Sequence, residues 1–144
     1  MKSFRQFVSE EEDHPEDVVE LAKHAYFKIM LDENLRVLES ALENDGFDVY
    51  VCAQGAPDDY VKRKARGGAI LTKNSQDFVD DAVRFDYDVI GIEDIKFIDD
   101  KQDRTNETVR KISAAVRRSH MATMRGTFLL KVRDNGSFHL LELQ

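Results

Sequence analysis

Residues 30–35 have the sequence Met-Leu-Asp-Glu-Asn-Leu, in which an apolar run is followed at once by a carboxylate, Asp32. Residues 69–78 repeat this arrangement, with the apolar run Ala-Ile-Leu, a polar stretch, and then the aspartate Asp77. Each apolar run is typical of a strand that ends where a helix begins. Ligand sites of open parallel sheets form outside the carboxyl ends of the strands. The sequence therefore predicts two acids at one rim of a parallel sheet.

The rest of the chain repeats this alternation of strands and helices. Continuous apolar strands that alternate with helices are typical of a mostly parallel α/β sheet. A long helix and a hairpin, turning at Asp134-Asn135-Gly136, follow and extend one edge of the sheet or pack beside it. The predicted strands are 27–31, 47–52, 69–72, 88–92, 128–132 and 138–143. A first predicted helix begins near Pro15, and the others span 35–43, 58–66, 75–85 and 103–124.

Size and composition favour one domain in a reducing compartment. The chain has 144 residues, of which 42% are hydrophobic. We expect a flexible acidic tail at residues 1–14 and a single domain at 15–144. No apolar run approaches the roughly 18 residues of a membrane span, so no membrane association is expected. The one cysteine, Cys52, lies in an apolar run and favours a packing role in a cytoplasmic protein.

Four carboxylates could meet at the predicted rim. Asp32 and Asp77 follow strands, and Asp58 or Asp59 opens the helix between them. Carboxylate oxygens are the ligands that Mg²⁺ and Mn²⁺ prefer, and an ion held by them can orient a water against a phosphodiester. Asp58, Asp59 and Asp77 are also explained as helix N-caps, which are often aspartate.

The amino-acid sequence of these segments resembles that of the PIN-like family of small metal-dependent ribonuclease domains. It is closest to a compact branch related to the C-terminal ribonuclease domain of certain exonucleases. The resemblance covers a core at residues 29–98, with residues 103–144 as an extension. It rests on residues 30–35, on Gly-Phe-Asp-Val at 46–49, on Asp-Asp-Tyr-Val at 58–61 with Ala65, on Ile-Leu-Thr-Lys-Asn at 70–74 with Asp77-Phe78, and on Val-Ile-Gly-Ile at 89–92.

The resemblance implies a three-layer α/β/α sandwich and an endoribonuclease that cleaves single-stranded RNA with Mg²⁺ or Mn²⁺. It implies that Asp32, Asp77 and Asp58 or Asp59 are catalytic, and that Asn74 joins Asp32 and Asp77 as a metal ligand. The family usually has aspartate at the position of Asn74, and here one extra residue separates this position from Asp77. Asparagine offers a neutral oxygen and no charge, so we expect a lower metal affinity unless Asp77 replaces the missing acid.

The basic residues are concentrated in two places, although the net charge is −7. At about 100° per residue, the arginines and lysine of the predicted helix 103–124 and Arg125 share an arc of roughly 140°. A solvated helix surface is the ordinary explanation of such an arc, and an RNA backbone track leading to the acids of the predicted rim is the functional interpretation that we prefer. A second group lies at residues 62–66. The predicted RNA-binding residues are Arg63, Lys64, Lys73, Arg110, Lys111, Arg117 and Arg118, and Arg104 lies on the same arc.

The first ten residues, Met-Lys-Ser-Phe-Arg-Gln-Phe-Val-Ser-Glu, resemble the N-termini of small proteins of large tailed bacteriophages. The resemblance implies a phage source, the host cytoplasm as location, and in some cases a removable packaging peptide. A disordered tail explains the same residues.

Three functional hypotheses stay open at this point. The first is the ribonuclease, and the second is a catalytically weak or inactive relative that binds RNA or protein, as Asn74 suggests. The third is a receiver-like signalling domain, which needs an aspartate after its central strand; the strand 47–52 ends in Cys-Ala-Gln and offers none. An antitoxin-like protein partner, a homodimer, and folding of the acidic tail over the basic helix are further possibilities that the sequence leaves open.

Overall fold

The structure, a computed structural model, describes residues 27–53, 55–96 and 102–144. The expected acidic tail and the helix from Pro15 lie outside these residues. In chain order the elements are β1 (Lys28–Leu31), η1 (Glu33–Leu38), α2 (Glu39–Asn44), β2 (Asp48–Val51), α3 (Asp58–Lys64), β3 (Ala69–Thr72), α4 (Gln76–Val79), α5 (Ala82–Phe85), β4 (Asp88–Gly91), α6 (Gln102–Ser119), η2 (Met121–Thr123), β5 (Thr127–Val132) and β6 (Phe138–Leu143).

The six strands form one sheet in the order β2-β1-β3-β4-β5-β6. All neighbours are parallel except β5 and β6, which pair antiparallel from Thr127 opposite Leu143 to Val132 opposite Phe138. The hairpin therefore extends the edge of the sheet, which decides between the two arrangements left open by the sequence. The predicted α/β class, with a mostly parallel sheet, a long helix and a hairpin, is confirmed.

The strand order reverses between β1 and β3. From β1 the chain crosses to β2 on one side, and from β2 it returns to β3 on the other. In open α/β sheets such a reversal opens a crevice at the carboxyl ends of the two strands, where ligands bind. Asp32 follows β1 and Lys73 follows β3. The residues that end these strands therefore lie at the position where this fold class binds ligands.

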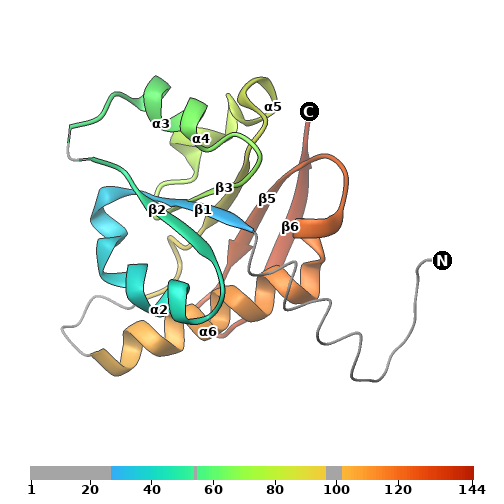
Figure 1. The fold of residues 1–144 in the computed structure, drawn as a ribbon. Helices are drawn as coiled ribbons and strands as arrows, with labels where there is room; N and C mark the ends of the chain where they lie inside the picture. Colours follow the sequence, from blue (N-terminus) through green and yellow to red (C-terminus); the bar gives the residue numbers. More distant parts are fainter. Residues whose placement is uncertain (1–26, 54, 97–101) are drawn as a thin grey trace.

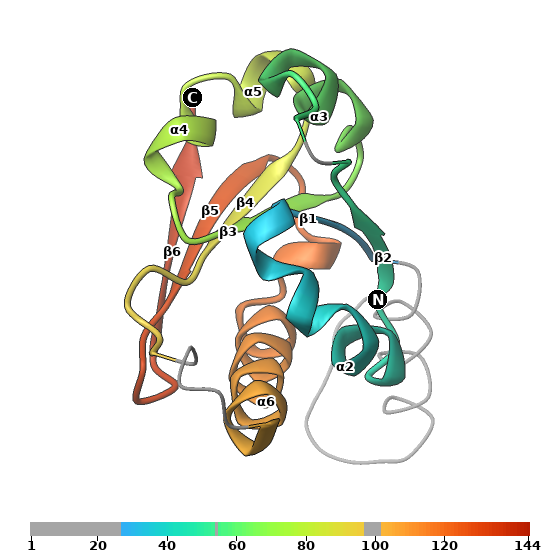
Figure 2. The same cartoon turned by 90° about the vertical axis from the view of Figure 1, so that its left-hand side faces the viewer.

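Helices cover both faces of the sheet (Figure 1). On one face, α2 and α6 pack over a core that includes Leu31, Leu71 and Ile112. On the other face, α3, α4 and α5 cover a second core that includes Met30 and Ile70. The view in Figure 2 shows the sheet between these two layers. Neighbouring residues of a strand point to opposite faces. The consecutive apolar residues of β1 and β3 therefore contribute side chains to both cores.

Two predicted helices differ from the observed ones. The segment 75–85 forms two short helices, α4 and α5, because the backbone leaves helical geometry at Asp81, whose carboxylate pairs with Lys62 of α3 at 2.8 Å. The long helix ends at Ser119, before the predicted Met124, because His120 adopts a left-handed conformation with φ of 61°. Arg125 therefore lies beyond α6. No described helix is long and apolar enough to cross a membrane.

Smaller differences concern helix starts. The predicted helix 35–43 begins earlier, as the 3-10 turn η1, and becomes α-helical only at Glu39. Asp58 and Asp59 lie in the first turn of α3, whose N-cap is Pro57, and no side chain caps that end. The N-cap explanation of these two acids is therefore wrong. Their charges still lie near the positive end of the helix dipole, a favourable position.

Candidate functional site

Asp32 lies where β1 ends beside β3. Its backbone N–H donates to the carbonyl of Leu71 at 3.2 Å, which fixes the end of β1 against β3. The Thr72 hydroxyl, fully buried at the end of β3, lies 3.4 Å from Asp32 Oδ2. The Asp32 side chain is itself half-buried. The structure thus brings the first predicted acid to the crevice formed by the reversal of strand order.

Asn74 and Asp77 continue this series of contacts. The Asn74 backbone N–H donates to Thr72 Oγ1 at 2.9 Å, and the Asn74 side-chain amide donates to Asp77 Oδ2 at 2.5 Å. Both side chains are exposed. Asp32, Thr72, Asn74 and Asp77 therefore form one hydrogen-bonded series, here called the acidic rim. The three predicted metal ligands all belong to it, and Thr72 connects them.

Asp58 lies exposed in the first turn of α3. Burial is the largest cause of a raised pKa at Cys52, and the charges of Asp32, Glu33 and Asp58 add to it, which brings the Cys52 pKa to about 11. The thiol is therefore protonated at neutral pH, which makes it a poor nucleophile. Asp59 is exposed in the first turn of α3.

Glu93, just after β4, is a residue of this region that the sequence reasoning missed. Its Oε2 accepts hydrogen bonds from the backbone N–H of Ser75 at 2.8 Å and from the Ser75 hydroxyl at 2.5 Å. Burial raises the pKa of Glu93, but the Ser75 hydrogen bonds, the backbone N–H of Glu93 itself and the charge of Lys131 outweigh it, so the pKa lies below its ordinary value. Glu93 thus holds the turn that presents Asn74. Its place directly after a strand was the available signal.

The oxygen donors of the acidic rim fit a hard divalent ion in kind but not in number. Across residues 27–53, 55–96 and 102–144, no three His, Cys, Asp or Glu side chains gather closely enough to hold a metal ion. The rim supplies two carboxylates, from Asp32 and Asp77, with a hydroxyl and a neutral amide between them. Mg²⁺ commonly binds to proteins through one or two carboxylates plus substrate phosphates, keeping several waters. Such a donor set is suited to an ion that arrives together with a phosphate.

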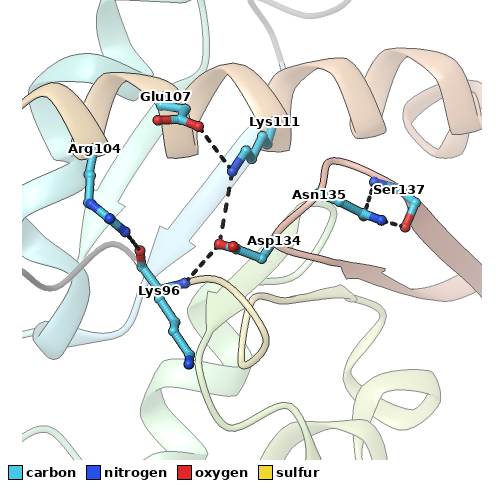
Figure 3. Close-up of polar contacts among 7 residues, drawn as sticks. All are labelled: Lys96, Arg104, Glu107, Lys111, Asp134, Asn135 and Ser137. Carbon is cyan, nitrogen blue, oxygen red and sulfur yellow. Dashed lines mark hydrogen bonds and ion pairs between the residues drawn. The ribbon is translucent and has the colours of Figure 1, made fainter.

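The basic side of α6 is partly engaged within the protein (Figure 3). Lys111 Nζ lies 3.3 Å from Glu107 Oε2 and 3.9 Å from Asp134 Oδ1 in the hairpin turn. Asp134 Oδ1 also accepts the backbone N–H of Lys96 at 3.2 Å, and Arg104 donates to the Lys96 carbonyl at 2.9 Å. These contacts join α6, the hairpin turn and the segment after β4. Arg104 and Lys111 therefore serve the fold, whatever else they bind.

Three other predicted cations of α6 are exposed: Arg110, Arg117 and Arg118. Arg117 donates to the Ser113 hydroxyl at 3.0 Å, and the Arg118 guanidinium lies 5.9 Å from the centre of the Phe138 ring. Since β5 is parallel to β4, the hairpin turn after β5 lies at the same end of the sheet as the acidic rim. Of these three, Arg110 and Arg118 border a hollow of about 450 Å³ with that turn.

The basic residues of α3 likewise include one that is paired within the protein and two that are exposed. Lys62 is buried and paired with Asp81, so it belongs to the core of that layer. Arg63 and Lys64 are exposed, and Lys73, after β3, is half-buried.

Comparison of the chain with family models, with curated proteins and with solved structures finds no match. The strand 47–52, on which the argument against a receiver domain was based, is the edge strand β2 and not a central one. The central strand β3 ends at Thr72 and is followed by Lys73 and Asn74, so it too offers no aspartate where a receiver domain needs one. The acidic rim, located where the strand order reverses, is the arrangement from which a function can be inferred.

Proposed function

We propose that the protein is a PIN-like, metal-dependent endoribonuclease that acts on single-stranded RNA at the acidic rim. The observation that carries this proposal is the hydrogen-bonded series from Asp32 to Asp77, located where the strand order reverses. Carboxylates at that location suit phosphoryl chemistry with a divalent ion. Exposed cations on α3 and near the hairpin turn suit an RNA backbone.

The donor set favours an ion that is held jointly by protein and RNA. Asp32 and Asp77 would contribute the charged ligands, and Asn74 a neutral one. Mg²⁺ or Mn²⁺ bound there would supply charge stabilisation for the phosphodiester and an oriented water. Asp32, held by its own backbone bond to Leu71 and by the Thr72 hydroxyl, provides the fixed side of the site. Because Asn74 carries no charge, the affinity for the ion alone should be low.

A second candidate is an RNA-binding module without cleavage. The contact from the Asn74 amide to Asp77 Oδ2 favours it, because this hydrogen bond occupies one oxygen of a carboxylate that the first proposal needs as a ligand. An amide at this position also removes a charge that a metal would otherwise find. This candidate keeps the RNA surface and changes only the chemistry.

Replacement of Asp32 tests the first proposal. We expect Asp32→Asn to lower the rate of Mn²⁺-dependent cleavage of single-stranded RNA at least about a hundredfold, because the fixed charged ligand is lost. The measurement is cleavage of an end-labelled RNA, with circular dichroism to verify the fold. Asp80→Asn is the matched control, since Asp80 is an exposed acid that follows α4 directly and lies outside the rim. Full cleavage by Asp32→Asn would rule out the proposed site.

Thermal unfolding separates the two candidates. A ligand that binds only the native state raises the melting temperature. If ion and RNA share one site, Mn²⁺ and RNA together should raise it by more than the sum of their separate effects, and Asp32→Asn should remove the excess. Additive effects together with an absence of cleavage would contradict the nuclease and support the binding module.

A further inference from the structure

A groove lies between α3 and the β2 edge of the sheet. Its volume is about 450 Å³, within the range of roughly 300–1,000 Å³ typical of small-ligand sites. The floor is apolar, with Met30 of β1 and Val61 of α3. The side chains that matter for its chemistry are Lys28, Tyr50, Tyr60 and Lys64.

Two aromatic rings line this groove and remain accessible. Tyr50 on β2 and Tyr60 on α3 are each 47% exposed. A single exposed aromatic needs no explanation, but here two rings from different elements line one hollow. The Tyr50 hydroxyl donates to Asp48 Oδ2 at 3.1 Å, which orients that ring on the edge strand. A ring held in this way offers a flat apolar surface at a low entropic cost.

Each ring has an ammonium group over one of its faces, which leaves the other face for a base. Lys28 Nζ lies 5.9 Å from the centre of the Tyr50 ring, and Lys64 Nζ lies 5.5 Å from the centre of the Tyr60 ring. Lys28 Nζ also donates to the Lys64 carbonyl at 2.8 Å, which joins β1 to the end of α3. Among the described residues that line the groove there is no acid, although the chain has 28 acids and 21 lysines and arginines. The groove is therefore a local cationic site in an acidic protein, suited to an anion.

One end of the groove adjoins the acidic rim. Cys52 lines the groove, and its backbone N–H donates to the carbonyl of Leu31, the residue before Asp32, at 3.1 Å. The charges of Asp32 and Asp58 both act on the Cys52 thiol. A chain lying in the groove would therefore lead to the carboxylates of the rim.

We propose that this groove is a nucleobase-binding subsite, in which bases of single-stranded RNA stack on Tyr50 and Tyr60 while Lys28 and Lys64 contact the phosphates. Flat aromatic faces and ammonium groups in alternation are what single strands require, since every base has a face to stack and every linkage carries a charge. The inference deepens the proposed function: it names the elements that hold the RNA and the side from which the strand reaches the rim. The inference rests on the proposed function only in assuming that RNA is cleaved at the acidic rim; binding of RNA in the groove does not depend on cleavage.

Binding without metal tests the subsite separately from catalysis. The affinity of a short fluorescein-labelled RNA is measured by anisotropy in EDTA, so that the outcome does not depend on cleavage. We expect Tyr50→Leu and Tyr60→Leu each to weaken binding about five- to a hundredfold, the usual effect of losing one base-stacking ring. Tyr50→Phe and Tyr60→Phe should bind like the wild type, because the ring is kept. Lys64→Gln should lower the slope of log affinity against log salt by about 0.7.

An abasic strand with the same number of phosphates makes the test specific for bases. The wild type should bind it as weakly as the double variant Tyr50→Leu/Tyr60→Leu binds ordinary RNA. The double variant should not distinguish the two strands, whereas each single variant, which keeps one ring, should still prefer the strand with bases. Leu141→Ala is the control, because Leu141 is an exposed apolar residue on β6, at the opposite edge of the sheet. Failure of the wild type to bind RNA, or leucine variants within twofold of it, would overturn the subsite. Loss of Mn²⁺-dependent cleavage with these binding results intact would overturn only the nuclease.

Discussion

Strand β4 has a partly buried acid at each end, and the two acids are held in opposite ways. At the carboxyl end, Glu93 accepts two hydrogen bonds from Ser75, and its pKa lies below the ordinary value. At the amino end, Asp88 accepts one, from the backbone N–H of Phe128 at 2.8 Å. Burial and the nearby Asp86 raise the pKa of Asp88 to about 6, against the lowering effect of that hydrogen bond.

The difference shows which end of the sheet is built to hold negative charge. A carboxylate that receives enough donors is stabilised in its charged form, whereas one that is desolvated with few donors is not. The carboxyl end, where the acidic rim lies, supplies two donors from the turn after β3 to Glu93 Oε2, whereas Glu93 Oε1 is buried with no hydrogen-bond partner in the described part of the chain. The amino end supplies a single backbone N–H among the described residues. The charged form of a carboxylate is therefore favoured at the rim end of β4, and the charge of Asp88 is expected to cost stability.

The largest expected effect is at Asp88. Its folded pKa of about 6 exceeds the ordinary 3.8, so the folded state binds more protons between these values and stability falls as pH rises from about 4 to 6. Above pH 6 the cost is about 3 kcal/mol, from a shift of about two pKa units at roughly 1.4 kcal/mol each. We expect Asp88→Asn, which keeps an oxygen for the Phe128 N–H, to be more stable by this amount at pH 7 and equal to the wild type near pH 4. Urea unfolding across this range measures it, and an unchanged pH slope would contradict the assignment.

Glu93 should show the opposite sign and a smaller effect. Its folded pKa lies below the ordinary 4.5, so its contribution is present above that pH and is lost as pH falls through the folded value. Glu93→Gln keeps an acceptor for Ser75 but loses the charge. We expect a loss of about 1 kcal/mol at pH 7, the usual difference between charged and neutral hydrogen bonds. Denaturant unfolding at pH 7 and pH 4 should show this gap closing in acid, and a gap that widens there would refute the role of the charge.

The sequence predicted the strands better than the site. Strands such as β3 are short apolar runs bounded by turn residues, so their local sequence is enough to predict them. The break between α4 and α5 falls at Asp81, whose carboxylate pairs with Lys62 of α3, a tertiary contact that no local pattern contains. The end of α6 depends on His120 at positive φ, a position usually taken by glycine.

The rim was predicted in part for the same reason. Asp32 and Asp77 were predicted because each follows or opens an element, and Asn74 because the family resemblance points to its position. Strand order alone brings their elements together. Thr72, which connects them, looked like an ordinary strand residue. The Tyr50–Tyr60 groove was missed because its two rings come from β2 and α3, whose side chains meet only in the folded protein. The hydrogen bond from Lys28 of β1 to the Lys64 carbonyl of α3 is a tertiary contact of the same kind. Chemistry that resides in one segment can be read from the sequence, and chemistry shared between segments requires the fold.

The smallest expected effect is at Asp86, and it tests whether burial or charge dominates at the amino end of β4. Asp86 has φ of 62°, a left-handed conformation that asparagine tolerates as well as aspartate does, so Asp86→Asn removes a charge without strain. Since burial is the larger cause of the raised Asp88 pKa and the Asp86 charge the smaller, the Asp88 pKa should fall by only a few tenths of a unit, on the order of 0.5 kcal/mol. NMR titration of the Asp88 carboxyl carbon measures this directly. A return of that pKa to its ordinary value would show that repulsion from Asp86, and not the scarcity of donors and water, distinguishes this end of the strand from the rim.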